Sequence, residues 1–575
     1  MSPAIIFDLR RDYRSRITRA GLFFSLIAIL PAGCMVGPDH VTPNVQAPDN
    51  WSSPHEAPEP TVTTQPAEAE ISLSAWWGNL DDPVLSSLIE RALDENLDLQ
   101  LADARIRRAI ALRGASFAEL FPAIGLDSSY LHQRTARNRV ARRDSSGPSA
   151  TLSKSASNIT GLGPPAANLR FGETSATISP PRPGDPAPNI NVTRSRTFGG
   201  PGDGFRRDSN LYETMLGATW EIDVWGNIRR SIEAADADVL SSIEDRHSVL
   251  VGLVAEVARN YIVLRGTQRQ LEITRENIDI QRTTVQTSQT RFAANLATGT
   301  DVLQAITQLK RTESEVPPLE ALIQDAAFRL SVLLGQHPSA LLEELIEQRP
   351  MPSTPDMLAI GLPSDLLRRR PDIRAAEQRL AAETALIGVE IAELFPRFSL
   401  TASFGLQTAD ADRYLHRDSL AWGFGPAVRW RLLEFGRIVS SIRAQEESQQ
   451  EALIIYHQTV LNALQEVESY LATYLAERRR VSALEEVNEA NRRAFDLAKE
   501  EYAVGMLGFL SVLDTQRSLF ANQTELIQSR QQSLINLVNL YEALGGGWYA
   551  DLDARDMPRD EPYAGERMAQ EAPPG

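Results

Sequence analysis

The sequence predicts a mixed α/β membrane protein in which a few β-barrel strands are joined to very long helices, all built by a tandem duplication. Three observations lead to this fold class. Four segments of about ten residues alternate between an apolar and a polar face, as barrel strands do. Two much longer segments carry the 3-4 apolar spacing of a coiled-coil helix. The same motifs also recur in both halves of the chain at fixed shifts.

The composition excludes some classes of function. With 42% apolar and 23% charged residues among 575, the chain has the make-up of an ordinary folded protein. Its net charge of −17 argues against a nucleic-acid partner, which would require a basic face. No run of 18 or more apolar residues occurs, so the sequence predicts no conventional transmembrane helix beyond an N-terminal targeting segment.

The N-terminus has the pattern of a secretory signal that ends at a lipidation site. Several arginines precede an apolar run over 20–30, and small residues lead from it to Cys34, the only cysteine of the chain. This position resembles the lipid acceptor of a bacterial lipoprotein, although Pro31 stands where such signals usually carry leucine. Met35 follows the cysteine, which by the lipoprotein rule implies sorting to the outer membrane. We expect a covalent lipid on Cys34; the alternative is an incidental cysteine in a cleaved peptide.

The two halves of the chain repeat each other. The stretch 220–226 returns as 430–436 at a shift of 210 positions, and 118–122 returns as 392–396 at a shift of 274. The 64-residue difference between the shifts places an insertion in the first half. The Gly-, Ser- and Pro-rich segment 134–207 supplies it, and this composition is typical of a flexible loop.

The domain prediction follows from these boundaries. The two repeats lie between an N-terminal lipid-anchored part and an acidic C-terminal tail. The predicted parts are a signal peptide at 1–33, a lipid-anchored linker at 34–75, a first repeat at 76–345, a second repeat at 346–548 and a flexible tail at 549–575.

The alternating segments lie in pairs, at 124–130 and 212–222 in the first repeat and at 398–406 and 420–432 in the second. A strand of a soluble sandwich would alternate in the same way, but here charged or small residues stand opposite the apolar face, as a wet lumen requires. The charged ones are Glu213, Glu221, Arg397, Arg429 and Arg431. The aromatic residues predicted for the membrane interface are Trp220, Trp225, Trp422, Trp430 and Phe435. Four strands leave open edges, so other copies must complete the barrel.

The helices are far longer than a compact domain needs. A proline-free stretch runs from 227 to about 294, and its counterpart in the second half carries the same seam of apolar residues. Roughly 70 helical residues would extend on the order of 100 Å. Because much of this length is polar, it must project into the periplasm. Each long helix ends at a glycine-bearing break, at 295–299 and 505–508, which we interpret as the far tips.

These residues resemble the TolC-like outer-membrane factors of the NodT type. The resemblance rests on the stretch 34–40, the pair Trp76-Trp77, the stretch 361–372 and the tip sequence 510–520. It covers about 34 to 548 apart from the insertion.

The resemblance implies a homotrimer with a twelve-stranded barrel that continues into a periplasmic helical tunnel. It also implies an efflux channel in the outer membrane that works with a periplasmic adaptor and an inner-membrane RND-type pump. No catalysis, cofactor or metal site is expected beyond the lipid on Cys34. The chain accordingly lacks a P-loop, HExxH or CxxC motif.

The resemblance also suggests gate residues near the second break. Asp514 matches a gate aspartate and Leu510 an apolar constriction one turn nearer the tip, while Ser511 stands where some relatives carry another aspartate. Three copies of Asp514 would converge on the pore axis, where carboxylates select cations. The alternative is a solvated aspartate on a helix surface.

In the first half, Asp301 and Gln304 occupy the positions equivalent to Ser511 and Asp514. An aspartate just after Gly299 is also typical of a helix N-terminus. The tips are predicted to dock the adaptor, and the simpler interpretation is that they are only turns. The tip residues are Leu296, Ala297, Thr298, Gly299, Gly505, Met506, Leu507 and Gly508.

Three other functions stay open at this point. A type I protein-secretion duct uses a similar tunnel, but such ducts usually lack a lipidation site. A periplasmic adaptor is also a lipoprotein with coiled-coil helices, but it would show no barrel strands. A purely structural coiled-coil lipoprotein would not need strands either.

The arginines at the start of the insertion would contact lipopolysaccharide phosphates if this loop faces outward. The alternative is that the loop is simply solvated.

Overall fold

The computed structural model describes residues 35–43, 75–134, 208–354 and 369–548, with shorter pieces between them. The shorter pieces are 48, 51, 61–63, 73, 167–171, 174–179, 189–194, 357–359 and 363. The predicted signal peptide, Cys34 and the C-terminal tail lie outside the described residues.

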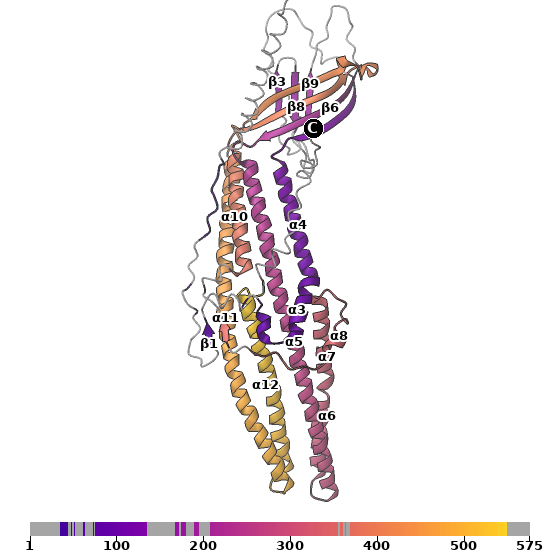
Figure 1. The fold of residues 1–575 in the computed structure, drawn as a ribbon, viewed down its shortest axis with the longest axis vertical. Coiled ribbons are helices and arrows are strands. Elements are labelled where there is room, and N and C mark those ends of the chain that lie inside the picture. The colour runs from indigo at the N-terminus through magenta and orange to yellow at the C-terminus, as the bar shows by residue number, and fades with distance from the viewer. Residues whose placement is uncertain are drawn as a thin grey trace, which may run out of the picture. The chain divides into compact units, whose positions relative to one another are not determined.

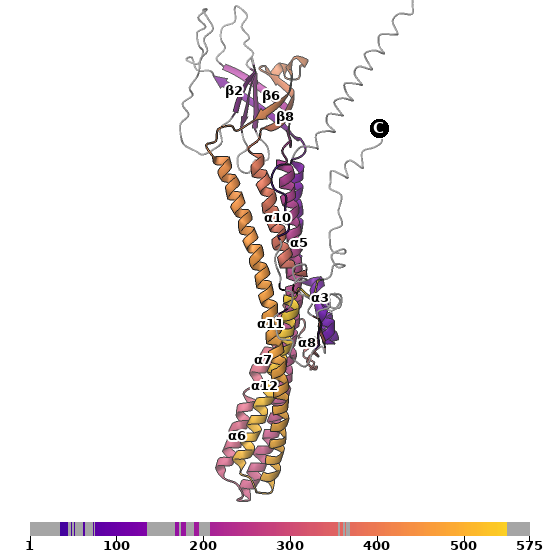
Figure 2. The same cartoon turned by 90° about the vertical axis from the view of Figure 1, so that its left-hand side faces the viewer.

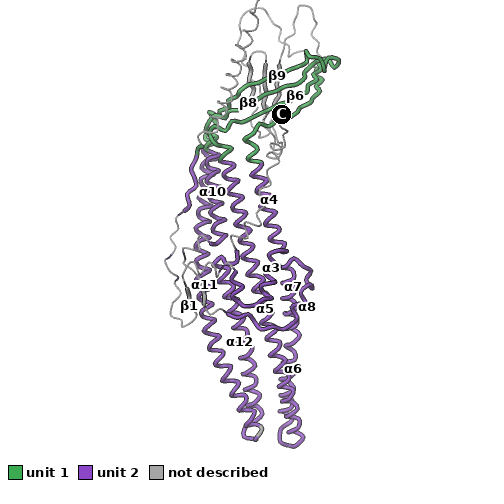
Figure 3. Tube along the Cα trace, viewed as in Figure 1, with its two compact units in different colours: residues 1–36, 115–229, 391–438 green, residues 37–114, 230–390, 439–575 purple. Residues whose placement is uncertain are grey.

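The chain forms two compact units, and each is built from both halves of the sequence (Figure 3). Unit 1 comprises Met1–Val36, Ala115–Arg229 and Ile391–Ile438. Unit 2 comprises Gly37–Gly114, Arg230–Glu390 and Val439–Gly575. The division therefore separates the main sheet from the long helices and does not follow the boundary between the two repeats.

A four-stranded antiparallel sheet forms the centre of unit 1 (Figures 1 and 2). Its strands are β2 (Ala123–Arg134), β6 (Asp208–Ile222), β8 (Arg397–Thr408) and β9 (Leu420–Arg429). Their order is β2-β6-β8-β9, so β2 and β9 are the two edges. The loop between β8 and β9 holds two short 3-10 turns, η4 (Ala411–Arg413) and η5 (Arg417–Ser419).

The strand register puts apolar and polar side chains on opposite faces of this sheet. Leu126 pairs with Leu216, which pairs with Phe404, which in turn pairs with Trp422. This row belongs to a face made largely of large apolar residues, because alternate residues of a strand share a face. The predicted polar residues Glu213, Glu221, Arg397 and Arg429 all fall on the other face.

The insertion contains strands that the sequence did not predict. A second, three-stranded antiparallel sheet is formed by β3 (Ala167–Phe171), β4 (Thr174–Ser179) and β5 (Asn189–Arg194). The prediction of a flexible loop over 134–207 is therefore wrong for these segments. Strands of five or six residues are hidden when composition is averaged over a long Gly- and Pro-rich stretch.

Unit 2 consists mainly of helices. Their bounds are η2 (Trp76–Leu80), α3 (Pro83–Glu95), α4 (Leu97–Ala118), α5 (Asn227–Ala293), α6 (Gly299–Glu313), α7 (Val316–Leu333), α8 (Leu342–Leu345), α10 (Pro371–Ala392), α11 (Arg437–Ala503) and α12 (Phe509–Ala543). Helices α4 and α10 both have 22 residues, and α5 and α11 both have 67. Both pairs of bounds keep the shifts of 274 and 210 that relate the sequence motifs. A parallel pair of three-residue strands, β1 (Thr61–Thr63) and β7 (Met357–Ala359), joins the N-terminal linker to the segment between α8 and α10.

Helices α4 and α5 lie side by side and are tied by two ion pairs. Arg246 of α5 bonds Asp103 of α4 at 2.6 Å, and Arg113 of α4 pairs with Asp236 of α5. Because the residue numbers run in opposite directions between these pairs, the two helices are antiparallel.

Further polar contacts extend the layer across α10 to α11. Arg379 of α10 contacts Asp245 of α5 at 2.6 Å. Gln445 of α11 donates to Glu383 of α10 at 2.5 Å. The layer order is therefore α4-α5-α10-α11, with α4 and α11 at its edges (Figure 1).

The main core lies where α3 and η2 pack against the middle of the long helices. Trp76 stacks on Tyr541 of α12 with ring centroids 5.0 Å apart, and both side chains are fully buried. Asp82 caps α3 by accepting hydrogen bonds from the backbone of Val84 and Leu85, and its other oxygen accepts one from Tyr261 of α5 at 2.7 Å. This cap fixes α3 to α5.

One described helix, α5, includes a stretch apolar enough to cross a membrane. Sixty-one per cent of that stretch is buried inside the structure. Its apolar residues are therefore accounted for by packing in the core of unit 2.

We expect unit 2 to lose stability between about pH 10 and pH 12. Burial, aided by the bond to Asp82, raises the pKa of Tyr261 to about 12, whereas an unfolded tyrosine has a pKa of about 10. A raised pKa favours the neutral folded form, so this contribution is complete below pH 10 and is lost as the pH rises to 12. Absorbance at 295 nm and circular dichroism, followed together, will measure it. Tyr261→Phe should flatten this loss, and identical alkaline profiles for both proteins would contradict the assignment.

Candidate functional site

Many side chains on the apolar face of the sheet are exposed, and the others are only partly covered. The large side chains of this face have no covering element in unit 1; Trp422, for example, is 75% exposed. Exposed apolar patches of this size mark a surface that contacts lipid or another protein. The exposed members of this face are Ile124, Leu126, Tyr130, Leu216, Phe404, Leu420, Trp422, Phe424 and Val428.

Two of the predicted interface tryptophans, one in each repeat, make equivalent hydrogen bonds. The indole of Trp220 donates to the carbonyl oxygen of Leu120 at 2.8 Å, and the indole of Trp430 donates to that of Leu394 at 3.0 Å. Both acceptors belong to the repeated Glu-Leu-Phe-Pro turn that precedes a first strand. Each tryptophan thus fixes its segment to the turn of its own repeat.

The other predicted interface aromatics have different surroundings. Trp225 is half-buried, stacks on Phe395 at 4.6 Å and donates to the carbonyl of Pro396. Phe435 is fully exposed and has a φ of +50°, a region that side chains rarely adopt. Trp422 lies near the opposite end of the sheet, two residues into β9. The five residues therefore do not form a single belt.

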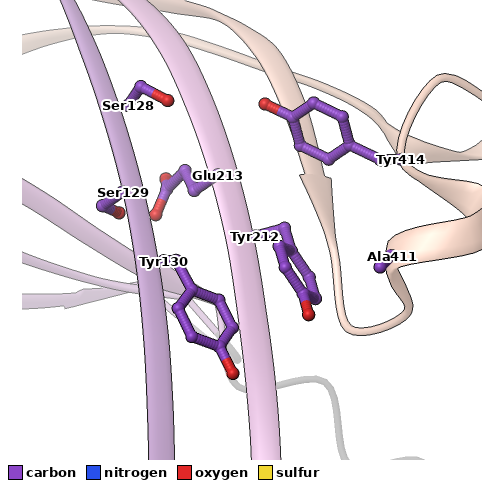
Figure 4. A pocket seen from close by; sticks show the side chains of 7 residues that line it. All are labelled: Ser128, Ser129, Tyr130, Tyr212, Glu213, Ala411 and Tyr414. Atoms are coloured by element: carbon purple, nitrogen blue, oxygen red, sulfur yellow. The ribbon is translucent and has the colours of Figure 1, made fainter.

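A cluster of tyrosines, which the sequence reasoning missed, lies at the β8–β9 loop end of the sheet. Tyr130 and Tyr212 pack at 4.8 Å across neighbouring strands, and Tyr414 from the loop faces Tyr212 at 6.5 Å (Figure 4). The hydroxyl of Tyr414 donates to Thr214. These rings border an open pocket of about 380 Å³ that Glu213 also lines. Amphipathic rings at the end of an apolar face are typical of a membrane interface.

Charged residues gather on the polar face at the opposite end of the sheet. Arg397 contacts Glu393, and it lies 3.5 Å from Glu221. Arg431 bonds the same Glu393 at 2.7 Å. Arg429 is paired in register with Arg397. Two carboxylates thus offset the repulsion among three guanidinium groups.

In unit 2, the glycine breaks form the turns of two helix hairpins. The α5–α6 turn spans 294–298 and the α11–α12 turn spans 504–508. Asn295 and Gly505 have φ values of +58° and +80°, as such turns require. Both turns present apolar side chains to solvent, with Leu296 68% and Met506 75% exposed. Both turns therefore expose apolar surface at the ends of the hairpins.

The candidate gate residues share one face of α12. Leu510, Ser511 and Asp514 are exposed, and Leu510 lies one turn before Asp514. In the described part of the chain, no hydrogen bond or ion pair is found for the Asp514 carboxylate. It is thus available for contacts outside the protomer.

Their counterparts in the first repeat are differently placed. Thr298 caps α6, and Asp301 completes a capping box in which its carboxylate accepts the backbone N–H of Thr298 at 2.8 Å. Gln304 is half-buried on the same helix. The capping interpretation accounts for Asp301 without a role in a gate.

A contact between the two hairpins near the tips was not predicted. The guanidinium of Arg291 on α5 lies over the ring of Tyr502 on α11, 4.4 Å from its centroid, and donates to the Tyr502 carbonyl at 3.3 Å. Burial raises the pKa of Tyr502 above its ordinary value, and Arg291 partly offsets this. Further from the tips, Arg517 of α12 donates to Gln308 of α6 at 2.9 Å. No sequence motif links these residues, because they meet only in the folded hairpins.

No metal centre is formed by the described residues, where no three His, Cys, Asp or Glu side chains come together as ligands. Cys34, the predicted lipid acceptor, lies outside the described residues.

Comparison with known proteins identifies the family of this arrangement. A family model described as outer membrane efflux protein matches residues 185–336 and 362–546, more than half of the chain. The chain belongs to the outer membrane efflux protein family. Nodulation protein T of Rhizobium leguminosarum bv. trifolii is 26% identical over 531 residues, covering 92% of this chain and 96% of that protein. The toluene efflux pump outer membrane protein TtgC of Pseudomonas putida is 28% identical over 538 residues, covering 93% and 96%.

The solved structures agree with the sequence relatives. The outer-membrane channel OprN superposes with a TM-score of 0.72 at 29% identity, over 90% of this efflux protein and 100% of that chain. This outer membrane efflux protein therefore has the TolC-like channel fold and resides in the outer membrane, where it is the channel component of an efflux system. These relatives favour efflux over a secretion duct, an adaptor or a structural lipoprotein.

We expect Arg291→Met to let the two hairpin tips separate. The change removes a cation–π contact and a hydrogen bond, together worth about 1–2 kcal/mol, so separated states should gain roughly tenfold in population. Spin labels at Leu296 and Met506 will report a broader distance distribution. Arg291→Lys keeps the charge and should broaden it less; an unchanged distribution in the Met variant would refute the contact's role.

Proposed function

We propose that three copies of this chain close a twelve-stranded barrel in the outer membrane and continue it as a helical tunnel into the periplasm. Small toxic molecules would enter from an inner-membrane RND-type pump through a periplasmic adaptor and leave the cell through the barrel. No chemical step is assigned to the channel itself.

The single observation that carries this proposal is the amphipathic sheet with two open edges. Its apolar face is exposed and its other face holds charged and small residues, as between lipid and a wet pore. The edge strands β2 and β9 would each leave backbone groups unpaired in lipid, where no water can satisfy them. Pairing β9 of one copy with β2 of the next removes both edges.

The residues after Cys34 support a lipid anchor in the same membrane. The backbone N–H of Val36 donates to the carbonyl of Trp225 at 3.1 Å, and Met35 packs on Gly226. All four residues belong to unit 1, which also contains the sheet. A lipid on Cys34 would therefore be attached directly before Met35 and Val36, which contact the unit that contains the sheet.

We further propose that Asp514 and Leu510 form the periplasmic gate and that the two turns dock the adaptor. Three exposed carboxylates brought to one axis would attract cations and repel anions, and Leu510 would narrow the pore beside them. The resemblance to the family pattern and the exposure of these side chains support this assignment. Ser511 adds only a neutral side chain to the same face.

Asp514→Ala should make the channel leakier to ions and less selective for cations. The substitution removes three charges from the proposed constriction, and we expect the reversal potential in a salt gradient to fall toward zero. Single-channel recording in planar bilayers will measure both properties. Asp279→Ala is the control, because this exposed aspartate lies about four helical turns before the end of α5 and its ion pair with Arg282 stays on the same helix. Equal conductance and selectivity in both variants would exclude Asp514 from the gate.

Deleting the gene should sensitise cells to small apolar toxicants, and the wild-type gene should restore resistance. Growth against antibiotics, dyes, bile salts, solvents and metal ions will define the substrate class. Cys34→Ser should restore resistance only in part if the lipid aids insertion. Loss of a secreted protein without any change in sensitivity would instead support a secretion duct.

A further inference from the structure

Helix α4 carries an unpartnered surface that combines leucines with arginines. Its buried residues, such as Ala102 and Ile106, pack toward the core, and the opposite side of the helix is exposed. On that side, Leu101 is 49% exposed and is followed at helical spacing by Arg105 and Arg108. Within the described chain, neither arginine has an ion pair or hydrogen bond.

Helix α11 has a surface of the opposite charge at the other edge of the layer. Opposite its buried residue Tyr456, an exposed strip contains Glu447, Glu451, Ile454 and, further on, Leu461. Ile454 is 56% exposed. Among the described residues, neither glutamate has a basic partner.

Contacts inside unit 2 fix where the basic residues Arg105 and Arg108 lie along the direction of the helix axes. The ion pairs of Asp103 and Arg113 with α5 bracket residues 105–108. These residues therefore stand level with the stretch 236–246 of α5.

Contacts in the same layer fix where the acidic residues Glu447 and Glu451 lie along this direction. Arg379 of α10 contacts Asp245 of α5 at 2.6 Å, and Glu383 lies about one helical turn further along α10. Glu383 accepts a hydrogen bond from Gln445 of α11. The acidic stretch 447–451 begins two residues after Gln445. It therefore stands level with 105–108 of α4, within about one or two helical turns of 5.4 Å.

We infer that the α4 surface of one copy binds the α11 surface of a neighbouring copy. In an antiparallel pairing, Arg108 meets Glu447, Arg105 meets Glu451 and Leu101 meets Ile454. The three residues are spaced by steps of three and four on both helices, so all three pairs form together.

The occupant of each surface is a second copy of this chain because the two surfaces complement each other in charge, spacing and height. The chain order agrees: α4 precedes the edge strand β2, and α11 follows the edge strand β9. Copies that pair β9 with β2 would therefore also bring α11 to α4. The inference rests on the proposed trimer. These contacts would set how the helices of neighbouring copies are aligned along their length. Complementary charges of this kind discriminate against wrong pairings.

Charge reversal and charge exchange will test the pairing in the full-length, membrane-inserted protein. Arg105→Glu with Arg108→Glu, or Glu447→Arg with Glu451→Arg, should weaken trimer formation about tenfold or more, because each reversal places like charges together. The four-fold variant exchanges the charges and should restore the trimer. Trimer fraction will be read by native mass spectrometry after detergent extraction. Glu90→Arg, on the exposed surface of α3, is the control and should leave the trimer unchanged.

A second measurement guards against variants that fail to fold. Leu101→Cys and Ile454→Cys in one chain should yield disulfide-linked protomers on mild oxidation, whereas either change alone should not. Full trimer formation by the charge-reversed variants, failure of the exchange variant to recover it while remaining helical, or absence of the disulfide each overturns the inference. A wild-type chain that is monomeric would instead refute the proposed trimer itself.

Discussion

An edge strand in lipid has no water to satisfy its backbone donors and acceptors, and the rest of this molecule depends on that constraint. The four strands of unit 1 have one face suited to hydrocarbon and one suited to a wet pore, yet two of them are edges. A single copy placed in lipid would leave the backbone groups of β2 and β9 unpaired. In the proposed trimer, association would pair the edge strands and also form the pore, so assembly and function would have the same physical origin.

The packing of the helical unit changes along the length of its helices. Its core is concentrated around Trp76, Tyr541 and the capped start of α3, where side chains are fully buried. Toward the tips the buried clusters are smaller. Ala305, Phe509 and Leu513 pack between the two hairpins, while Leu296 and Met506 in the turns are exposed. The large core thus lies in the middle of the helical unit, and only small buried clusters hold the end that a gate would use.

Periodicity made much of the fold predictable. Strands with period two and helices with period 3.6 repeat their signal over many residues, so the ends of α5 and the tip turns were located within a few residues. The strands inside the insertion are too short to build such a signal. Contacts such as Arg291 with Tyr502, or Tyr414 with Thr214, join segments about 200 residues apart, and no local pattern records them. The candidate gate residue Asp514 came from family resemblance and not from periodicity.

The matching bonds of Trp220 and Trp430 give the chain an internal comparison between two copies of one ancestral design. Where the copies still agree, as at these indoles and the equal lengths of α5 and α11, the shared feature belongs to the scaffold. Where they have diverged, as at Asp514 against Gln304, each half has been free to specialise. Comparing the two repeats therefore points to residues that bear on transport without comparison to a second protein.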